Sequence, residues 1–277
     1  VLLACTYKKV IRLLFESGQR RENMALQYGL SISEIMDFFC EEEHAGFTEQ
    51  EIKQAEENVG ASLPSVYREF LKAYGKDEIN SFFNQLFSPP NDIFTTYQAI
   101  EEELEDWEPE FQEAVENGSE DEYADNEYFT MWQLPKERWN EVTENYVLIW
   151  CENQGVWNAG YLLKDLLEGQ PDPQVHMSIN DDFITFAKVG NTEQFLMEML
   201  REAAYGYHVE DLHICRESSE INKMLAENQI DMERLYPDDT KPFIGTCLDS
   251  DHGRLFFYSI GKNNSQELYY ANRTEEE

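Results

Sequence analysis

Residues 47–75 read FTEQEIKQAEENVGASLPSVYREFLKAYG, and this stretch predicts two consecutive helices joined by a turn. Thr48 and Glu51 have the spacing of a capping box, which satisfies two of the free N–H groups at a helix start. Gly60 takes a left-handed helix end at little cost, and Pro64 is suited to the first turn of the next helix. The apolar spacing predicts two buried stripes, made by Ile52, Ala55 and Val59 and then by Tyr67, Phe70, Leu71 and Tyr74.

Working outward from this pair, the order of parts resembles the opening of the SUKH superfamily. That family has a helix, a Leu-Pro, a helix with Tyr and Phe-Leu, and then a glycine. The chain carries these parts as Leu63-Pro64, Tyr67, Phe70-Leu71 and Gly75. Further similarities follow in the family's order: a hairpin at 146–157, an Asp-Pro-x-Val segment at 172–175 and a closing helix around 195–200.

The resemblance implies an α+β fold, a mainly antiparallel sheet flanked by helices, over residues 24–207. Other elements come from the sequence pattern. Ser31 with Glu34 predicts a helix through about Glu42, residues 128–132 read as a strand, and Asn191 caps a helix through about Tyr205. Residues 208–277 predict a C-terminal extension with a helix at 216–228 and strands at 243–248, 255–260 and 267–270. We expect this extension to pack on the main domain, because a unit of three strands has only marginal stability by itself.

Residues 1–23 differ from the rest of the chain because they carry five Lys or Arg against two Glu. Arg20-Arg21-Glu22-Asn23 matches a translated purine-rich ribosome-binding site ahead of Met24. We therefore expect a non-native upstream segment at 1–23. The competing interpretation is an amphipathic N-terminal helix with Val10, Leu13 and Leu14 on one face.

The composition limits the classes of partner. The 277 residues carry a net charge of −35, which opposes binding to nucleic acid or to an anionic membrane and favours a basic protein partner. The alternative is that the acidity only keeps the protein soluble. The five cysteines are scattered without a CxxC pair, which predicts a reducing, cytoplasmic compartment.

The acidic charge is concentrated in one part of the chain. The 59 residues between Lys76 and Lys136 contain 17 Asp or Glu and no Lys or Arg, with aromatic residues interleaved. Aromatic side chains supply contact area and carboxylates supply electrostatic steering, so this composition suits a protein interface. The alternative is a solvated helix face whose aromatic residues point into the core. The predicted partner-binding residues are Glu101, Glu102, Glu105, Asp106, Trp107, Glu108, Glu113 and, in the hairpin, Glu152 and Trp157.

Signals for catalysis or for a bound metal are weak. His208, His213 and Cys215 are the nearest approach to a metal cluster, but a closed zinc site needs four ligands, so we expect no metal and no cofactor. The sequence has no nucleophile elbow, phosphate loop or HExxH motif. A hydrolase using Glu152 between Trp150 and Trp157 is an alternative, and ordinary turn chemistry at 152–155 is the simpler interpretation.

By resemblance, the chain is expected to be a non-catalytic immunity protein of the bacterial cytoplasm. It would bind and neutralise a cognate polymorphic toxin domain, for example a nuclease whose basic groove accepts an acidic surface. A regulatory scaffold, as in the fungal branch of the family, is the second expectation.

Overall fold

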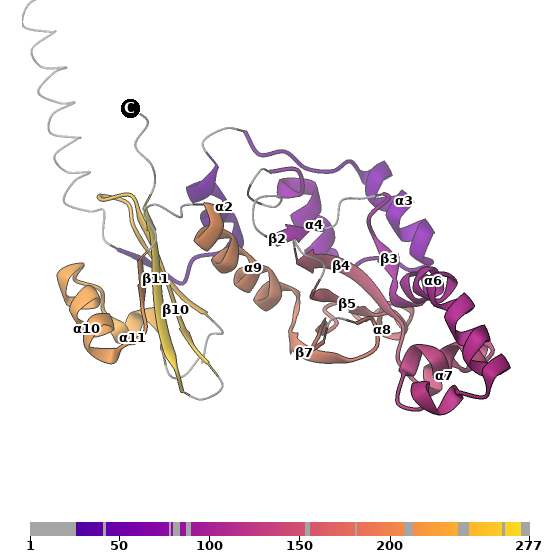
Figure 1. Cartoon of the computed structure of the whole chain (residues 1–277). Helices are drawn as coiled ribbons and strands as arrows, with labels where there is room; N and C mark the ends of the chain where they lie inside the picture. The colour runs from indigo at the N-terminus through magenta and orange to yellow at the C-terminus, as the bar shows by residue number, and fades with distance from the viewer. Residues whose placement is uncertain are drawn as a thin grey trace, which may run out of the picture. The chain divides into compact units, whose positions relative to one another are not determined.

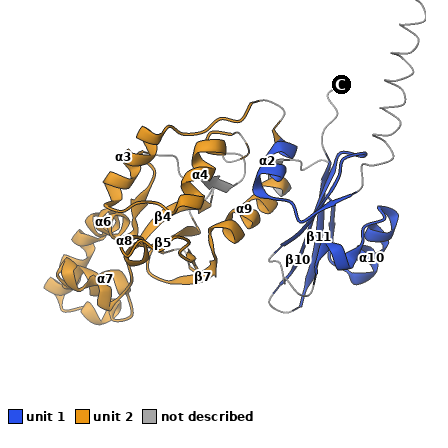
Figure 2. Cartoon of the chain, turned by 180° about the vertical axis from the view of Figure 1, so that it is seen from behind, with its two compact units in different colours: residues 1–39, 208–277 blue, residues 40–207 orange. Residues whose placement is uncertain are grey.

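The computed structural model describes residues 26–40, 43–77, 79, 84–86, 90–152, 156–180, 182–207, 213–237, 244–261 and 264–272. Contacts divide the chain into two compact units, residues 1–39 with 208–277 and residues 40–207, which are coloured separately in Figure 2. Residues 1–23 lie outside the described residues, so both interpretations of that segment stay predictions. Among the described residues, no helix is long and apolar enough to cross a membrane.

The unit of residues 40–207 is built on an antiparallel sheet. Its strand order is β2-β4-β5-β6-β7, and a short strand β3 also pairs with β4. The strands are β2 (Asn84–Leu86), β3 (Phe94–Thr95), β4 (Tyr146–Glu152), β5 (Asn158–Leu162), β6 (Val175–Ser178) and β7 (Phe186–Gly190). The first five residues of β4 are all buried, which places this strand at the centre of the unit.

Helices surround this sheet (Figure 1). They are α3 (Glu49–Val59), α4 (Ser65–Tyr74), α6 (Thr96–Asn117), α7 (Glu127–Gln133), α8 (Leu163–Leu167) and α9 (Thr192–Tyr207), with short 3₁₀ turns at Glu120–Tyr123 and Lys136–Glu141. Tyr67 on α4 donates a hydrogen bond to the Ile149 carbonyl of β4 at 3.3 Å. Phe195 on α9 packs edge-on against Trp150, so α4 and α9 both pack on the sheet.

Local sequence signals set the helix starts as predicted, whereas α2 (Ile32–Phe39) ends at Phe39 and not near Glu42. The Thr48–Glu51 capping box is present, and Gly60 ends α3 with φ of 72°. Ser31 and Glu34 exchange reciprocal hydrogen bonds, and Asn191 accepts from the Gln194 N–H at the start of α9. The predicted stripes are buried, except that Tyr74 is half-buried.

The strand predicted at 128–132 is wrong, because these residues lie in α7. The side chain of Asn126 accepts a hydrogen bond from the Phe129 N–H and so starts a helix. Phe129 and Met131 are buried in a cluster that also contains Phe111 and Trp139. A run of aromatic residues favours a strand by propensity, and here the local cap and the tertiary packing override it.

The other unit contains a five-stranded antiparallel sheet in the order β1-β9-β10-β11-β8. Its elements are β1 (Gln27–Tyr28), α2 (Ile32–Phe39), β8 (His213–Cys215), α10 (Ser218–Glu227), α11 (Met232–Leu235), β9 (Ile244–Asp249), β10 (Arg254–Ile260) and β11 (Gln266–Asn272). Helices α10 and α11 lie on one face of this sheet (Figure 1) and share its core. The predicted helix and three strands are therefore present within about two residues.

The residues just after Met24 need a correction. They were expected within the SUKH-like domain at 24–207, but they belong to the unit that contains the C-terminal strands. Strand β1 pairs with β9, and the Leu30 N–H donates to Thr246 Oγ1 at 2.7 Å. Two antiparallel sheets with flanking helices confirm the α+β class, whereas the packing of the extension on the main domain stays a prediction.

Candidate functional site

Helix α6 carries most of the predicted partner-binding residues and is fixed firmly to the sheet. Thr95 and Gln98 form a capping box at its start. Thr96 Oγ1 then accepts a hydrogen bond from the Tyr146 N–H of β4 at 3.0 Å. Ile100, Leu104 and Phe111 are buried, so the opposite side of the helix is presented to solvent.

The carboxylates of α6 are exposed as predicted. Glu101, Glu105 and Glu108 follow helical spacing, and Glu102, Asp106 and Glu113 lie on the adjoining strip. Lys136 pairs with Glu101 at 2.5 Å. Within the described residues no ion pair or hydrogen bond is found for Glu102, Glu105, Asp106 and Glu113. This face therefore has little local compensation for its negative charge.

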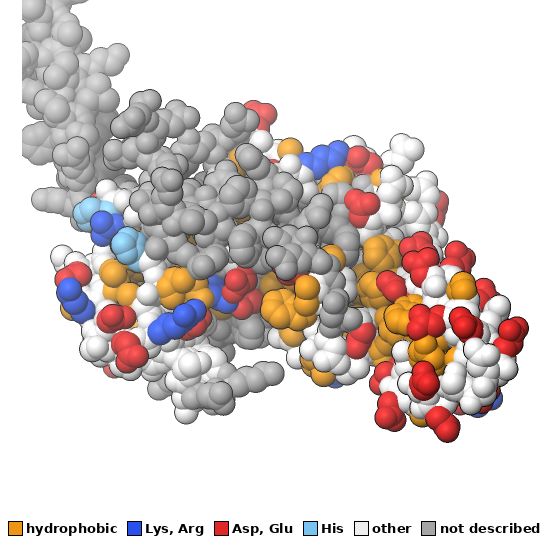
Figure 3. Space-filling view, viewed as in Figure 1, with side chains coloured by type: hydrophobic (Ala, Val, Ile, Leu, Met, Phe, Trp, Pro, Cys, Tyr) orange, Lys and Arg blue, Asp and Glu red, His pale blue; other side chains and the backbone are white. Residues whose placement is uncertain are grey.

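Two tryptophans that the sequence interpretation did not choose share this surface. Trp132 and Trp139 line an open hollow of about 620 Å³ together with Gln98, Glu101, Glu102, Leu104, Glu105 and Glu108. Trp139 is fixed by donating from Nε1 to the Met131 carbonyl at 3.0 Å. Carboxylates gather over α6 and α7 with apolar side chains between them (Figure 3). The sequence signal was the aromatic content of 128–139, which the incorrect strand prediction obscured.

Lys136 shows how this hollow accommodates a cation. Besides its pair with Glu101, its ammonium lies over the Trp139 ring, 5.6 Å from the centroid. A carboxylate beside an aromatic face attracts a cation both by charge and by the ring quadrupole. The arrangement therefore suits Lys or Arg side chains of a partner.

Trp107 lies elsewhere on the helix. Trp107 follows Glu105 by two residues, so the two side chains leave the helix in directions about 200° apart around its axis. Its ring stacks on Phe111 with centroids 5.6 Å apart and remains 36% exposed. Near it, Tyr123 donates a hydrogen bond to Glu110, and this bond raises the pKa of Tyr123 to about 12. Trp107 is therefore the edge of the aromatic cluster and not part of the acidic hollow.

The hairpin residues form a second, separate location. Glu152 is half-buried and is the last residue of β4. Helix α6 begins beside Tyr146, the first residue of that strand, so Glu152 lies about 20 Å from the start of α6. Trp157, just before β5, is 49% exposed, and Ile179, just after β6, is 58% exposed. The nine predicted residues thus do not meet in one site.

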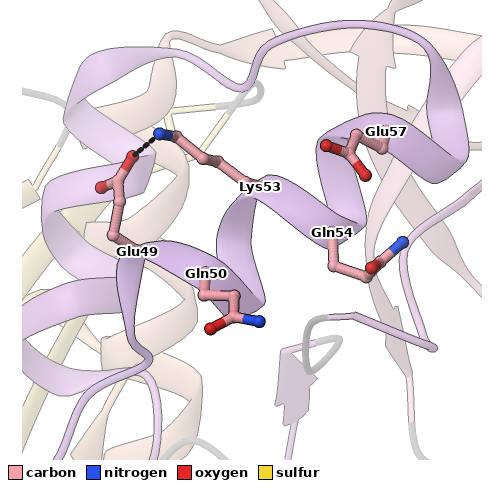
Figure 4. Close-up of a pocket in the computed structure, with 5 residues that line it drawn as sticks. All are labelled: Glu49, Gln50, Lys53, Gln54 and Glu57. Atoms are coloured by element: carbon pink, nitrogen blue, oxygen red, sulfur yellow. Dashed lines mark ion pairs between the residues drawn. The ribbon is translucent and has the colours of Figure 1, made fainter.

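A hollow along α3 provides a contrast (Figure 4). It measures about 410 Å³ and is lined by Glu49, Gln50, Lys53, Gln54 and Glu57. Lys53 pairs with Glu49, and Glu49 is also paired with Arg68 and Lys72. These partners lower the pKa of Glu49, and the hydrogen bond with Lys72 has the largest effect. Unlike the α6 hollow, this surface has its charges balanced internally.

The residues predicted as the nearest approach to a metal cluster serve packing where they are described. His208 lies outside the described residues. His213 stacks on Tyr270 with ring centroids 4.4 Å apart, and Cys215 is buried in the core beneath α10. A different set of ligand-type side chains, Cys40, His44 and Asp77, does come together, with one ligand atom from each lying within 4.8 Å of the others.

Comparison with protein-family models identifies the family of the chain. The model SUKH_6, described as SMI1-KNR4 cell-wall, matches residues 49–205, more than half of the chain. The chain belongs to the SUKH superfamily. The matched part of this SUKH protein covers α3 to α9 and therefore the acidic hollow on α6. No curated protein and no solved structure matches the sequence significantly.

Proposed function

We propose that this SUKH protein is a non-catalytic immunity protein of the bacterial cytoplasm, which binds and neutralises a basic toxin domain through the acidic face of α6. The observation that carries the proposal is the α6 hollow, where four glutamates and two tryptophans form one surface with a single paired lysine. A nuclease must expose a basic groove to bind phosphates. Occupation of that groove by carboxylates excludes the substrate without any chemical step.

Electrostatics favours this surface for fast capture. Between Glu101 and Glu127 the chain has 14 Asp or Glu and no Lys or Arg, so the negative field has little compensation beyond the Lys136–Glu101 pair. Steering between opposite charges raises association toward ~10⁸–10⁹ per molar per second at low salt. A toxin must be captured before it acts, so rapid association is the property that such a protein requires.

The test begins with affinity capture of the natural partner and continues with its activity. We expect the captured protein to be a toxin whose activity is lost when one equivalent of this SUKH protein is added. A partner without toxic activity, or one whose activity is unchanged, contradicts the proposal.

Binding kinetics then test the surface. The α6 variant carries Glu101→Gln, Glu102→Gln, Glu105→Gln and Asp106→Asn. The matched variant carries Glu217→Gln, Glu220→Gln, Glu227→Gln and Glu233→Gln on exposed positions of the other unit, with the same change in net charge. We expect only the α6 variant to associate more slowly and with a weaker salt dependence. Equal rates for the two variants contradict an α6 interface and direct attention to Trp157 and Ile179.

A regulatory scaffold is the second candidate, because the matching family model is described by a cell-wall role. In that case the captured partner is not a toxin, and the complex leaves the partner's activity intact. The same capture experiment separates the two functions.

A further inference from the structure

Three side chains of different ligand type meet beside the start of α3 and the end of α4. Cys40 follows α2, His44 lies in the segment before α3, and Asp77 lies just after α4. One ligand atom from each side chain lies within 4.8 Å of the other two. This cluster could not be predicted from the sequence pattern, because Asp77 is 33 residues from His44.

The cluster is fixed by its surroundings. The Asp77 side chain is only 3% exposed, and its Oδ1 accepts a hydrogen bond from the Ala45 N–H at 2.7 Å. Its Oδ2 lies 2.7 Å from His44 Nδ1. The His44 ring also packs edge-on against Tyr74, with centroids 4.8 Å apart. The carboxylate and the imidazole are thus oriented before any ligand arrives, while His44 remains 25% exposed and reachable from solvent.

We propose that Cys40, His44 and Asp77 bind a zinc ion. Sulfur, nitrogen and oxygen donors together suit zinc, whereas calcium and magnesium prefer oxygen ligands only. Zinc bonds of ~2.0–2.3 Å in a tetrahedral arrangement separate the ligand atoms by roughly 3.3–3.8 Å. His44 Nδ1 and Asp77 Oδ2, now 2.7 Å apart, need to separate by roughly 0.6 Å, and a ligand atom as far as 4.8 Å from its neighbour needs to approach by about 1 Å. A water molecule completes the fourth position.

Binding displaces a proton from the thiol. Cys40 binds as the thiolate and releases its thiol proton to solvent. Zinc also enters between His44 Nδ1 and Asp77 Oδ2, in place of the proton that these two atoms share. Each zinc ion bound therefore releases at least one proton.

The experiment is a calorimetric titration of the full chain with Zn²⁺, in the presence of excess Mg²⁺ to occupy exposed carboxylates. We expect one zinc per chain, with a heat that depends on the ionisation enthalpy of the buffer because the Cys40 thiol proton is released. Co²⁺ used in place of zinc should give the visible bands of a tetrahedral ion and a thiolate charge-transfer band in the near ultraviolet.

Matched variants locate the ion. Cys40→Ser should remove the charge-transfer band, and both Cys40→Ser and His44→Ala should weaken zinc binding by more than the roughly 10–100-fold that loss of an outer partner costs. Cys151→Ser, at another half-buried thiol, should change nothing. His252→Ala removes a second His–Asp pair of the same 2.7 Å length, which belongs to no three-ligand cluster among the described residues, and should also change nothing.

Two results overturn the proposal. One is the absence of stoichiometric zinc binding by the wild-type chain under these conditions. The other is unchanged binding in Cys40→Ser, a conservative replacement whose fold is checked by circular dichroism.

Discussion

At the scale of a single residue, Phe70 tests the packing of α4 on the sheet. Its side chain is 5% exposed and lies on the same stripe as Tyr67 and Leu71. We expect Phe70→Ala to lower the free energy of unfolding by ~3–5 kcal/mol, because the removed ring leaves a cavity in a packed core. Chemical denaturation measures the loss, and Val66→Ala on the exposed side of the same helix should change stability by no more than ~0.5 kcal/mol. Equal stability of the two variants would mean that the stripe is not buried.

His176 makes a pH-dependent contribution to stability. Burial lowers its pKa from the ordinary 6.5, and the nearby charge of Lys188 acts in the same direction. Its Nδ1 has no hydrogen-bond partner among the described residues. As the pH falls through 6.5, the unfolded chain takes up a proton at this ring before the folded chain does. The unfolded state then binds more protons, so the free energy of unfolding falls.

The matched measurement is denaturation of wild type and His176→Phe at about pH 8 and about pH 5.5. Tyr146, whose ring lies 5.2 Å from that of His176, provides an aromatic neighbour for the new ring. We expect the variant to lose less stability than wild type between the two pH values. His252→Gln, at an exposed position, serves as the control. A wild-type and a His176→Phe chain with the same pH profile would contradict the assignment.

Gly75 was predicted from sequence to end α4, and it does so for a reason that sequence cannot supply. Its φ of −59° is open to any residue. A Cβ at this position would lie 2.5 Å from Phe47 Cδ2 and 2.6 Å from the Leu71 carbonyl oxygen. The glycine is required by a close approach of two segments, whereas Gly60 is required by a positive φ.

At the scale of the element, α6 contains a proline in its interior. Pro109 is exposed and lies between Glu108 and Glu110, well inside the 22 residues of the helix. Proline removes one backbone hydrogen bond and is up to ~3 kcal/mol less favourable than alanine there. We expect Pro109→Ala to raise the melting temperature in a thermal scan, with Glu103→Ala on the same exposed surface as the control. A lower melting temperature would show that Pro109 is needed to seat Phe111 and Ala114.

Elements whose ends are marked by local chemistry were predictable from sequence. The boxes at Thr48 and Ser31 and the cap at Asn191 all act within three residues, so they can be read without the fold. Helix α7 was missed because its aromatic residues have a strand-like propensity, and the Asn126 cap together with burial against Phe111 decides between the two states. The α6 hollow could not be predicted for the same reason, since Trp132 and Trp139 reach it through α7 and the following turn.

At the scale of the whole molecule, the net charge of −35 opposes the compact state. Raising NaCl from about 0.01 M to about 0.15 M shortens the screening length from about 30 Å to about 8 Å. We expect the melting temperature to rise over this range, because repulsion among the carboxylates is reduced. The melting temperature of the α6 variant should rise less with salt than that of the matched variant, since its four removed charges come from the less compensated of the two surfaces. A melting temperature that falls with salt would mean that ion pairs outweigh repulsion.

The division into two units was the part of the fold least accessible from sequence. Periodicity and caps report on neighbours along the chain, whereas β1 pairs with a strand more than 200 residues later. A two-residue strand has no pattern to recognise. The C-terminal helix and meander were predictable one by one, but the N-terminal strand that joins them was not.

The pairing of β1 with β9 also orders the events of protein synthesis. Tyr28 leaves the ribosome long before Cys247, its partner in the ladder. At 5–20 residues per second, the interval is roughly 10–45 s. The whole sheet that carries α6 is complete within that interval and is free to fold first. Strand β1 therefore remains without its ladder partner until β9 has been synthesised.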